Sequence, residues 1–232
     1  MSPARNQTTL VARATAPVWS VADGKLRPRW RGRLHGLGFV LSLTAAPILV
    51  LAADSVAASV GLAVYALSLM ALFGTSAAYH LLARTEKTQR LMRRADHSMI
   101  FVMIAGTYTP VCLLALPRSW GIPILVTIWV AAASGVAIKL LAGPWLLRIS
   151  NLLYLLLGWI AIGALPVILR YLTTTEFTLL AIGGVLYTIG AILFALRVPR
   201  LVPSTFGYHE VWHGFTVLAA MAHFAMVWSV AI

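Results

Sequence analysis

Seven long apolar stretches constrain the fold of this chain more than any other feature of its sequence. They lie at 34–53, 56–82, 97–116, 121–141, 149–169, 178–196 and 211–231. A helix needs about 20 residues to cross the hydrocarbon core of a bilayer, and each stretch is close to that length. Polar or helix-breaking residues separate the stretches, as in the basic segment 83–96 and at Gly143-Pro144. The sequence therefore predicts an all-α membrane protein, a bundle of seven transmembrane helices.

Composition agrees with that fold and disfavours other classes of protein. Of the 232 residues, 60% are hydrophobic and only 10% are charged, whereas soluble domains carry about 25% charged residues. The formal net charge of +12 is spread between the apolar stretches, and a nucleic-acid-binding protein would concentrate such charge on one polar domain. The single cysteine, Cys112, allows no disulfide within the chain and is expected to be a small buried side chain.

The positions of lysine and arginine predict how the helices are oriented. Seven spans leave only Arg118 and Arg170 on one side, and the remainder of the 18 basic residues on the other. Because basic residues collect on the cytoplasmic side, the amino end is predicted to be cytoplasmic and the carboxyl end outside. The chain divides into a basic, disordered tail at 1–33 and a transmembrane domain at 34–232. The tail ends in a basic patch expected to contact anionic headgroups: Lys25, Arg27, Arg29, Arg31 and Arg33.

Ionisable side chains within the spans gather at one depth. His80 ends the second stretch, Asp96-His97 begins the third, and segment 209–213 begins the last. With the predicted topology, all of these positions lie near the cytoplasmic side. Ionisable groups inside a membrane are costly and usually functional, so their shared depth predicts a single site.

The chemistry of that site follows from its histidines. His209 and His213 are four residues apart, so on a helix they share one face, one turn apart. Two such imidazoles can hold one zinc ion, and further ligands must come from other helices. Three imidazoles would leave zinc an open position for water, and a nearby carboxylate could accept the proton of that water. Only two carboxylates, Asp96 and Glu210, lie next to histidines in the sequence.

Other residues near this depth have plainer interpretations. His97 is expected at the interface, and His35 is either a neighbour of the site or without a role in it. His223 lies ten residues past His213, about 15 Å deeper along a helix, and fits a hydrogen-bonding residue of the bundle better than a metal ligand. Most tryptophans and tyrosines are expected to anchor the helices at the membrane interfaces.

Segment 209–213, His-Glu-Val-Trp-His, also satisfies the H-E-x-x-H pattern of zinc proteases, in which the glutamate is the general base. Only three positions of that pattern are fixed, so chance matches are frequent. A protease would also leave Ser76, His80 and Asp96 at the same depth without a role. Glu210 is about 100° from His209 around the helix, so it is expected to face away from the metal.

Three motifs resemble the hemolysin III family, and the likeness spans residues 33–232. They are Ser76-Ala-Ala-Tyr-His80, the run from Arg94-Ala-Asp96-His97 to Gly106-Thr-Tyr-Thr-Pro110, and Gly207-Tyr-His-Glu-Val-Trp-His213 followed by His223-Phe224. This family is the bacterial branch of the progestin and adipoQ receptors, which include the adiponectin receptors. The resemblance implies seven transmembrane helices, a cytoplasmic amino end and a place in a bacterial plasma membrane.

The resemblance also implies a zinc site near the cytoplasmic side, with His80, His209 and His213 as ligands. Asp96 matches the aspartate that holds the zinc-bound water, and Ser76 matches the small hydroxyl residue beside it. The wider superfamily includes alkaline ceramidases, and some bacterial members are named for cytolytic activity. In one departure, the family's first motif usually carries acidic residues before its histidine, whereas segment 31–35 here, Arg-Gly-Arg-Leu-His, has none.

Three hypotheses about function follow. The leading one is a zinc-dependent hydrolase of a lipid amide or ester, ceramide-like, with Asp96 as the base. The second is a non-catalytic sensor, lipid-binding or cytolytic membrane protein, in which zinc holds the second and seventh spans together. The third is a membrane-embedded metalloprotease. The first two predict a membrane lipid, ceramide-like or fatty acyl, as substrate or ligand.

Overall fold

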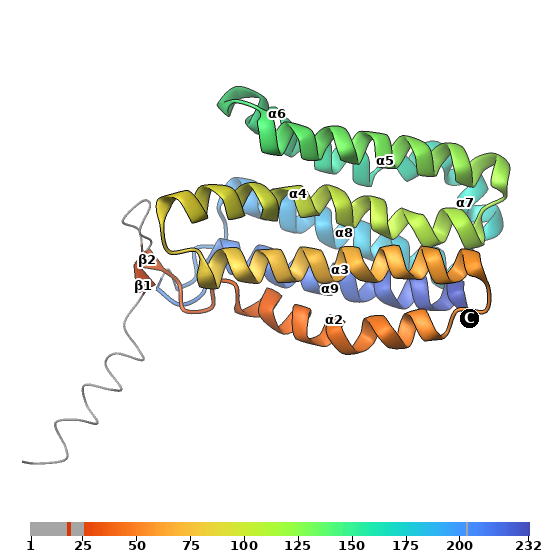
Figure 1. Ribbon diagram of the computed structural model, residues 1–232, viewed down its shortest axis with the longest axis horizontal. Coiled ribbons are helices and arrows are strands. Elements are labelled where there is room, and N and C mark those ends of the chain that lie inside the picture. The colour runs from red at the N-terminus through yellow and green to blue at the C-terminus, as the bar shows by residue number, and fades with distance from the viewer. Residues whose placement is uncertain (1–17, 20–25, 203) are drawn as a thin grey trace, which may run out of the picture.

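The computed structural model describes residues 18–19, 26–202 and 204–232, and it contains seven helical spans (Figure 1). Five spans are single helices: α2 (Arg33–Leu51), α3 (Val56–Leu82), α5 (Arg118–Leu141), α8 (Thr174–Leu196) and α9 (Tyr208–Ala231). The third span is α4 (Glu86–Pro110), continued by a π-helical turn, η1 (Val111–Ala115). The fifth combines α6 (Pro144–Gly158), the 3-10 helix η2 (Ile160–Ala164) and α7 (Leu165–Tyr171). Before α2, β1 (Val18–Trp19) pairs antiparallel with β2 (Leu26–Arg27).

The predicted fold class, a bundle of seven membrane-length helices, is confirmed, but several helices begin earlier than hydropathy predicts. α4 starts inside the basic segment that we expected to be a break. The Thr85 hydroxyl caps its first turn by accepting a hydrogen bond from the Thr88 N–H at 3.2 Å. Thr173 caps α8 in the same way. Hydropathy marks the part of a helix that is apolar, whereas a capped helix can begin in polar sequence before it.

The helices form two layers (Figure 1). α2, α3, α4 and α5 lie side by side in one layer, with α9 behind α3, α8 behind α4, and α6 with α7 behind α5. The most extensive packing joins α8 to α9, α3 to α4 and α2 to α3. By contrast, α6 and α8 scarcely contact one another within the described residues. Their connection is a hydrogen bond from Trp159 Nε1 to Thr188 Oγ1 at 3.0 Å, and α7 packs on α8 further along.

The distribution of apolar side chains is that of a protein surrounded by lipid. Large apolar residues such as Leu51 and Leu141, each 84% exposed, cover the outside of the bundle. Between helices, small residues permit close approach. A Cβ added to Gly106 would lie 2.3 Å from the Ser68 hydroxyl of α3, and one added to Gly135 would lie 2.5 Å from the Phe101 ring. These two glycines therefore let α4 pack tightly on α3 and on α5.

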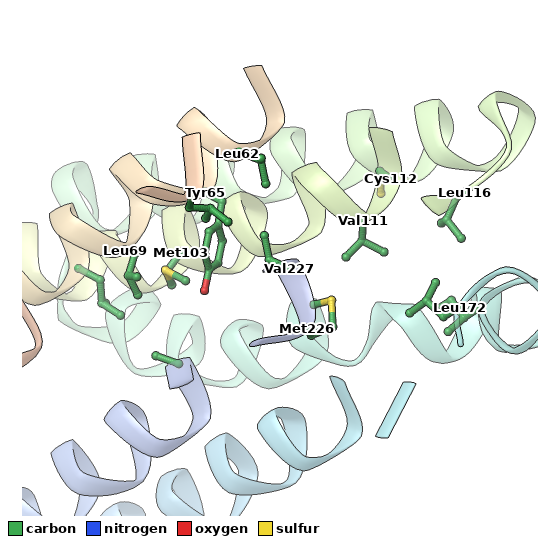
Figure 2. Packing of buried hydrophobic residues seen from close by; sticks show 14 of the residues in the cluster. Leu62, Tyr65, Leu69, Met103, Val111, Cys112, Leu116, Leu172, Met226 and Val227 are labelled. Carbon is green, nitrogen blue, oxygen red and sulfur yellow. The ribbon is translucent and has the colours of Figure 1, made fainter. Parts of the chain in front are cut away.

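A buried apolar cluster fills the space between the layers, and Figure 2 shows part of it, including Leu69, Met103 and Met226. Cys112 is 2% exposed in this cluster, so its prediction as a small buried side chain is confirmed. Tyr65 lies among the same apolar side chains with 0% exposure. It therefore departs from the expectation that tyrosines lie mostly at the membrane interfaces.

Candidate metal centre

Three histidines from two helices meet at one end of the bundle. His80 lies near the end of α3, and His209 and His213 lie in the first two turns of α9. Each offers one ring nitrogen, and these three nitrogens all lie within 4.8 Å of one another. The Nε2 atoms of His80 and His209 are 3.2 Å apart. His80 and His213 are 6% and 2% exposed, so the group, called the histidine cluster below, is largely shielded from solvent.

The geometry of the histidine cluster fits a tetrahedral metal ion. Zinc–nitrogen bonds of about 2.0–2.1 Å place two ligand nitrogens about 3.4 Å apart across a tetrahedral edge. The separation of 3.2 Å between the His80 and His209 nitrogens is close to that edge. The limit of 4.8 Å for the whole set requires the rings to shift by little more than an ångström to enclose an ion. The three histidines thus lie close enough to bind one metal.

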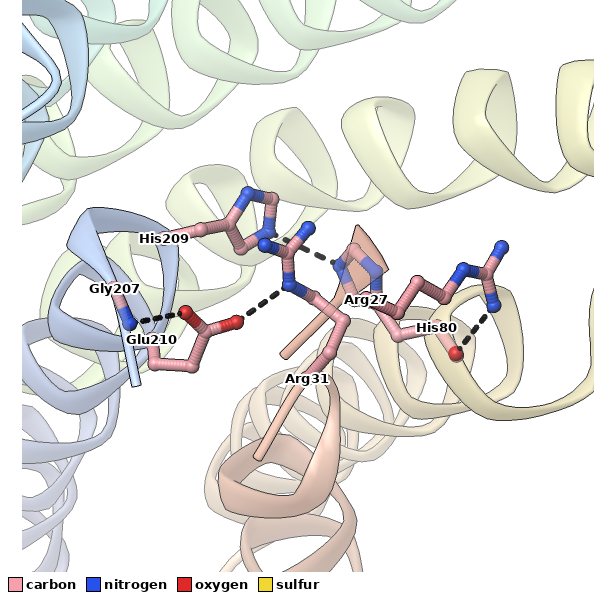
Figure 3. A network of polar contacts seen from close by, with 6 residues as sticks. All are labelled: Arg27, Arg31, His80, Gly207, His209 and Glu210. Carbon is pink, nitrogen blue, oxygen red and sulfur yellow. Dashed lines mark hydrogen bonds and ion pairs between the residues drawn. The ribbon is translucent and has the colours of Figure 1, made fainter. Parts of the chain in front are cut away.

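Backbone caps fix the helix ends that carry these histidines (Figure 3). Arg27 donates from Nη1 to the His80 carbonyl at 2.8 Å and from Nη2 to the Ala83 carbonyl at 3.2 Å, at the end of α3. At the start of α9, the Gly207 N–H donates to Glu210 Oε2 at 2.8 Å. Terminal carbonyls and N–H groups of a helix need such partners. The caps therefore hold the His80 end of α3 and the His209 end of α9 in place.

Glu210 is fully buried, and both of its carboxylate oxygens are engaged. Oε2 accepts from the Gly207 N–H, and Oε1 forms an ion pair with Arg31 Nε. Figure 3 shows the two carboxylate oxygens directed at Gly207 and Arg31. The carboxylate is not among the grouped ligand atoms, which agrees with the expectation from its place on the helix.

The segment just before α2 lies against the histidine cluster. The N–H groups of Arg29 and Trp30 donate to the carbonyls of Ser204 and Thr205, at 3.1 and 3.2 Å. Gly32 has a φ of +79°, and a Cβ there would lie 2.5 Å from the Cβ of His80. The glycine is required twice, by the left-handed conformation and by the close approach to α3. The chain between β2 and α2 therefore crosses the end of α3 beside His80.

This arrangement differs from the basic, disordered tail expected at 1–33. Most of that tail, including Lys25, lies outside the described residues. Its last part, from Leu26 onward, is ordered, and two of its arginines turn inward. Arg27 caps α3 and Arg31 pairs with Glu210. Those two side chains serve the protein interior in place of the headgroup contacts that we expected.

His35, which the sequence left without a definite role, lies against the histidine cluster. Its ring stacks on that of His213 with centroids 3.8 Å apart and planes inclined by 11°. It is 3% exposed, and both of its ring nitrogens lack a hydrogen-bond partner in the part of the chain that the structure describes. The lone pair of an imidazole nitrogen lies in the ring plane. Two stacked, nearly parallel rings therefore cannot direct lone pairs to the same ion, and His35 does not complete the ligand set.

Asp96 and Ser76 lie side by side outside the histidine cluster. The Ser76 hydroxyl is within interaction range of the Asp96 carboxylate, but the contact falls outside hydrogen-bonding geometry. Ser76 is 1% exposed, whereas Asp96 is half-buried on α4. Neither is among the atoms grouped as metal ligands. No hydrogen bond joins the two residues among those the structure describes, and the roles predicted for both stay predictions.

His97 and His223 are not members of the histidine cluster. The His97 backbone carbonyl accepts a hydrogen bond from the Tyr154 hydroxyl at 2.9 Å, and its ring is not grouped with the ligands. His223 Nε2 lies 3.2 Å from the Leu180 carbonyl, which confirms the prediction of a hydrogen-bonding residue within the bundle.

Comparison with known proteins decides the family. The sequence profile described as "Haemolysin-III related" matches residues 24–224. The chain belongs to the hemolysin III family. It is 31% identical to the Hemolysin-3 homolog of Bacillus subtilis over 196 residues, which cover 83% of this chain and 89% of that protein. It is 34% identical to Hemolysin-3 of Bacillus cereus over 186 residues, 79% of this chain and 82% of that relative.

A more distant human relative, the Monocyte to macrophage differentiation factor, is 25% identical over 175 residues, 71% of this chain and 68% of that protein. These matches agree with the resemblance that the three motifs indicate and with a place in the progestin and adipoQ receptor superfamily. Together with the seven apolar helices, they identify this hemolysin III protein as an integral membrane protein.

Proposed function

We propose that this hemolysin III-family protein is a zinc-dependent hydrolase that cleaves an amide or ester bond of a membrane lipid, such as a ceramide-like molecule. The observation that carries the proposal is the convergence of His80, His209 and His213 at the end of a membrane-spanning bundle. Nitrogen ligands of this kind suit zinc, and three of them are typical of catalytic zinc sites.

Under this proposal, His80, His209 and His213 hold the ion and His35 does not. A zinc ion bound there polarises a carbonyl oxygen and lowers the pKa of a water molecule toward 7. The ring of His35 is stacked nearly parallel to that of His213, so its lone pairs cannot point to the ion that His213 would bind. This stacking supports a site of three histidines. Zinc held by three histidines would keep a position for a reacting group.

Asp96 and Ser76 are the residues we assign to proton transfer. The Asp96 carboxylate accepts the proton of the attacking water and passes it to the leaving amine or alcohol, as a general base and then a general acid. We assign Ser76, whose buried hydroxyl has no hydrogen-bond partner among the described residues, to positioning this carboxylate during the reaction. Glu210 is a poorer candidate for the base, since Arg31 and the Gly207 N–H already engage both of its oxygens.

A lipid substrate is supported by the surroundings of the site. Segment 28–32 and the Arg31–Glu210 ion pair cover the end of the bundle at the histidine cluster. A substrate arriving from water would have to pass this cover, which favours a substrate held in the bilayer. We place this end at the cytoplasmic side of a bacterial plasma membrane, as the distribution of basic residues predicts.

The second candidate function is non-catalytic. α3 and α9 make few direct contacts with one another, so a metal on His80, His209 and His213 would itself be a main link between them. In that case the ion is structural, and the protein is a sensor or a lipid-binding protein. Replacement of a ligand histidine would then lower the melting temperature of the protein together with its metal content.

The test combines metal analysis, a ceramide-hydrolysis assay and thermal unfolding. The purified protein is expected to contain one zinc per chain, and His80→Ala to contain almost none. Asp96→Asn should keep the zinc and the fold and lose hydrolysis of a fluorescent short-chain ceramide, whereas Glu210→Gln should keep activity. Hydrolysis that survives Asp96→Asn but is lost in Glu210→Gln would reverse the assignment and favour the metalloprotease. Zinc-dependent stability without hydrolysis would favour the structural role.

A further inference from the structure

Three polar side chains meet in the middle of the bundle, away from the histidine cluster: Tyr65 of α3, Tyr187 of α8 and His223 of α9. The ring centroids of Tyr187 and His223 are 5.7 Å apart. Tyr65 lies 6.3 Å from the ring of Phe224, which follows His223, and is within electrostatic range of Tyr187. His223 is ten residues beyond His213, about 15 Å along the helix axis. We call these three residues the core polar group.

Each member of the core polar group has a buried polar atom that finds no hydrogen-bond partner among the described residues. These atoms are Tyr65 Oη, Tyr187 Oη and His223 Nδ1. Tyr65 is 0% exposed and His223 is 8% exposed. Figure 2 shows Tyr65 among apolar side chains such as Leu69 and Met103. Since unsatisfied polar groups inside a membrane protein are strongly unfavourable, three of them in one place indicate a shared partner.

The close packing around His223 indicates a specific arrangement. A Cβ added to Gly183 of α8 would lie 2.2 Å from the His223 ring. Only glycine at 183 therefore lets this imidazole reach the α8 backbone, where its Nε2 lies 3.2 Å from the Leu180 carbonyl oxygen. A carbonyl oxygen only accepts, so Nε2 carries the proton. In a neutral imidazole the other nitrogen, Nδ1, is then an acceptor.

The hydrogen-bonding capacities of the three atoms define the chemistry of their partner. His223 Nδ1 needs a donor, while the two tyrosine hydroxyls are free to donate and need an acceptor. A hydroxyl group can donate to Nδ1 and accept from one or both tyrosines at the same time. A carbonyl or ether oxygen cannot donate, and an ammonium group cannot accept.

We propose that Tyr65, Tyr187 and His223 form a binding site for a single hydroxyl group within the bundle. Its source is either a bound water molecule or the hydroxyl of a long-chain lipid whose apolar part lies between the helices. The site does not depend on a metal or on hydrolysis.

Thermal unfolding of tyrosine-to-phenylalanine variants tests the site. If a hydroxyl is bound, Tyr65→Phe removes one of its hydrogen bonds and should lower the melting temperature by about 2–4 °C. Tyr108→Phe is the matched reference, because the Tyr108 hydroxyl has partners in the structure: it donates to the Gly158 carbonyl and accepts from the Ala161 N–H, each at 3.0 Å. Tyr187→Phe serves as the second variant if Tyr65→Phe does not fold. Metal content should be unchanged in every case.

An unchanged or higher melting temperature in Tyr65→Phe and Tyr187→Phe, with a fall in Tyr108→Phe, would overturn the proposal. That result would mean that the two hydroxyls have no partner and that their removal costs nothing.

A matched pair of probes identifies the source of the hydroxyl. Protein freed of lipid in lauryldimethylamine oxide, a detergent without a hydroxyl, is melted with 1-decanol or with decyl methyl ether. Greater stabilisation by decanol in the unmodified protein, absent in Tyr65→Phe, indicates a lipid hydroxyl. Equal effects of the two probes, together with the fall in Tyr65→Phe, indicate a water molecule.

Discussion

The histidine cluster and the core polar group contain the same kind of side chain in two different settings. In the histidine cluster, the ring nitrogens of His80 and His209 face one another at 3.2 Å. In the core polar group, one nitrogen of His223 is already directed at the Leu180 carbonyl. The other ring nitrogen of His223 has no partner among the described residues, and a single histidine of this kind is suited to bind a hydroxyl group. A metal centre requires several imidazoles with free lone pairs that converge.

The two settings also differ in the contacts that hold their side chains and backbone in place. Around the histidine cluster, the ion pair between Arg31 and Glu210 and the caps at the ends of α3 and α9 fix the backbone. Around the core polar group, the neighbours are apolar side chains and one close glycine, Gly183. Loss of the ion pair or of a cap should therefore weaken metal binding at the histidine cluster and should leave the core polar group unchanged.

The largest expected effect is a difference in zinc binding between two histidine-to-alanine variants of α9, one in each group. His213→Ala should lower zinc affinity by at least about 100-fold, since loss of residues that only orient metal ligands already costs 10–100-fold. His223→Ala, ten residues further along α9, should retain one zinc per chain. Metal analysis of both variants after equilibration with buffered zinc measures the difference. Equal zinc loss in the two variants would show that metal binding follows the integrity of the bundle and not the ligand set.

The next effect concerns the buried ion pair. Arg31→Ala leaves the Glu210 carboxylate buried without its cation and should destabilise the protein by about 2–4 kcal/mol, because the Glu210 side chain is 0% exposed. The exposed pair Arg90–Glu86, with side chains 73% and 60% exposed, is the control, and Arg90→Ala should cost about 0.5 kcal/mol or less. Unfolding by denaturant gives both values. The double variant Arg31→Ala with Glu210→Gln should recover part of the loss, and a failure to recover would argue against the ion pair.

A smaller effect is expected at Gly32. Alanine there must adopt a φ of +79° and bring its Cβ within 2.5 Å of the His80 Cβ, which should cost about 1–3 kcal/mol. The same change at Gly163, where an added Cβ meets nothing within 4 Å, should stay within about 0.5 kcal/mol. Melting curves with and without zinc would show whether the displaced His80 also weakens metal binding. Similar costs at the two positions would mean that segment 28–32 does not press on α3.

Much of the frame of the candidate site could be predicted from the sequence. Hydropathy gives the number and order of the spans, and the basic residues place His80, Asp96 and segment 209–213 at one depth. A four-residue spacing then brings His209 and His213 to one helix face, where the structure finds them with His80. These predictions rest on helical periodicity, which depends only on neighbouring residues, and on the cost of charge in a membrane, which can be judged from the whole sequence.

Contacts between distant segments with no periodic pattern could not be predicted. Arg31 and Glu210 are separated by 179 residues, and the composition of 1–33 favoured a solvated tail. The stacking of His35 on His213 depends on the close approach of α2, which the sequence marks only by single glycines. Tyrosines as a type favour the membrane interfaces, whereas packing between α3 and its neighbours places Tyr65 in the core. Tertiary packing decided each of these cases.

The smallest expected effect tests whether the stacked imidazole belongs to the metal site at all. His35→Phe keeps an aromatic ring against His213 and against Phe73, whose centroid is 5.2 Å away, but it removes both nitrogens. Because a ring parallel to that of His213 cannot share its ion, the variant should still bind one zinc per chain, with an affinity changed by less than about 10-fold. His35→Ala, which also removes the stacking, should weaken binding further because the His213 ring becomes free to turn. Titration with a zinc-responsive dye compares the two variants. If His35→Phe lost zinc as completely as His213→Ala, His35 would have to rotate out of the stack to coordinate the ion, and the cluster would be a closed site of four histidines without a position for a substrate.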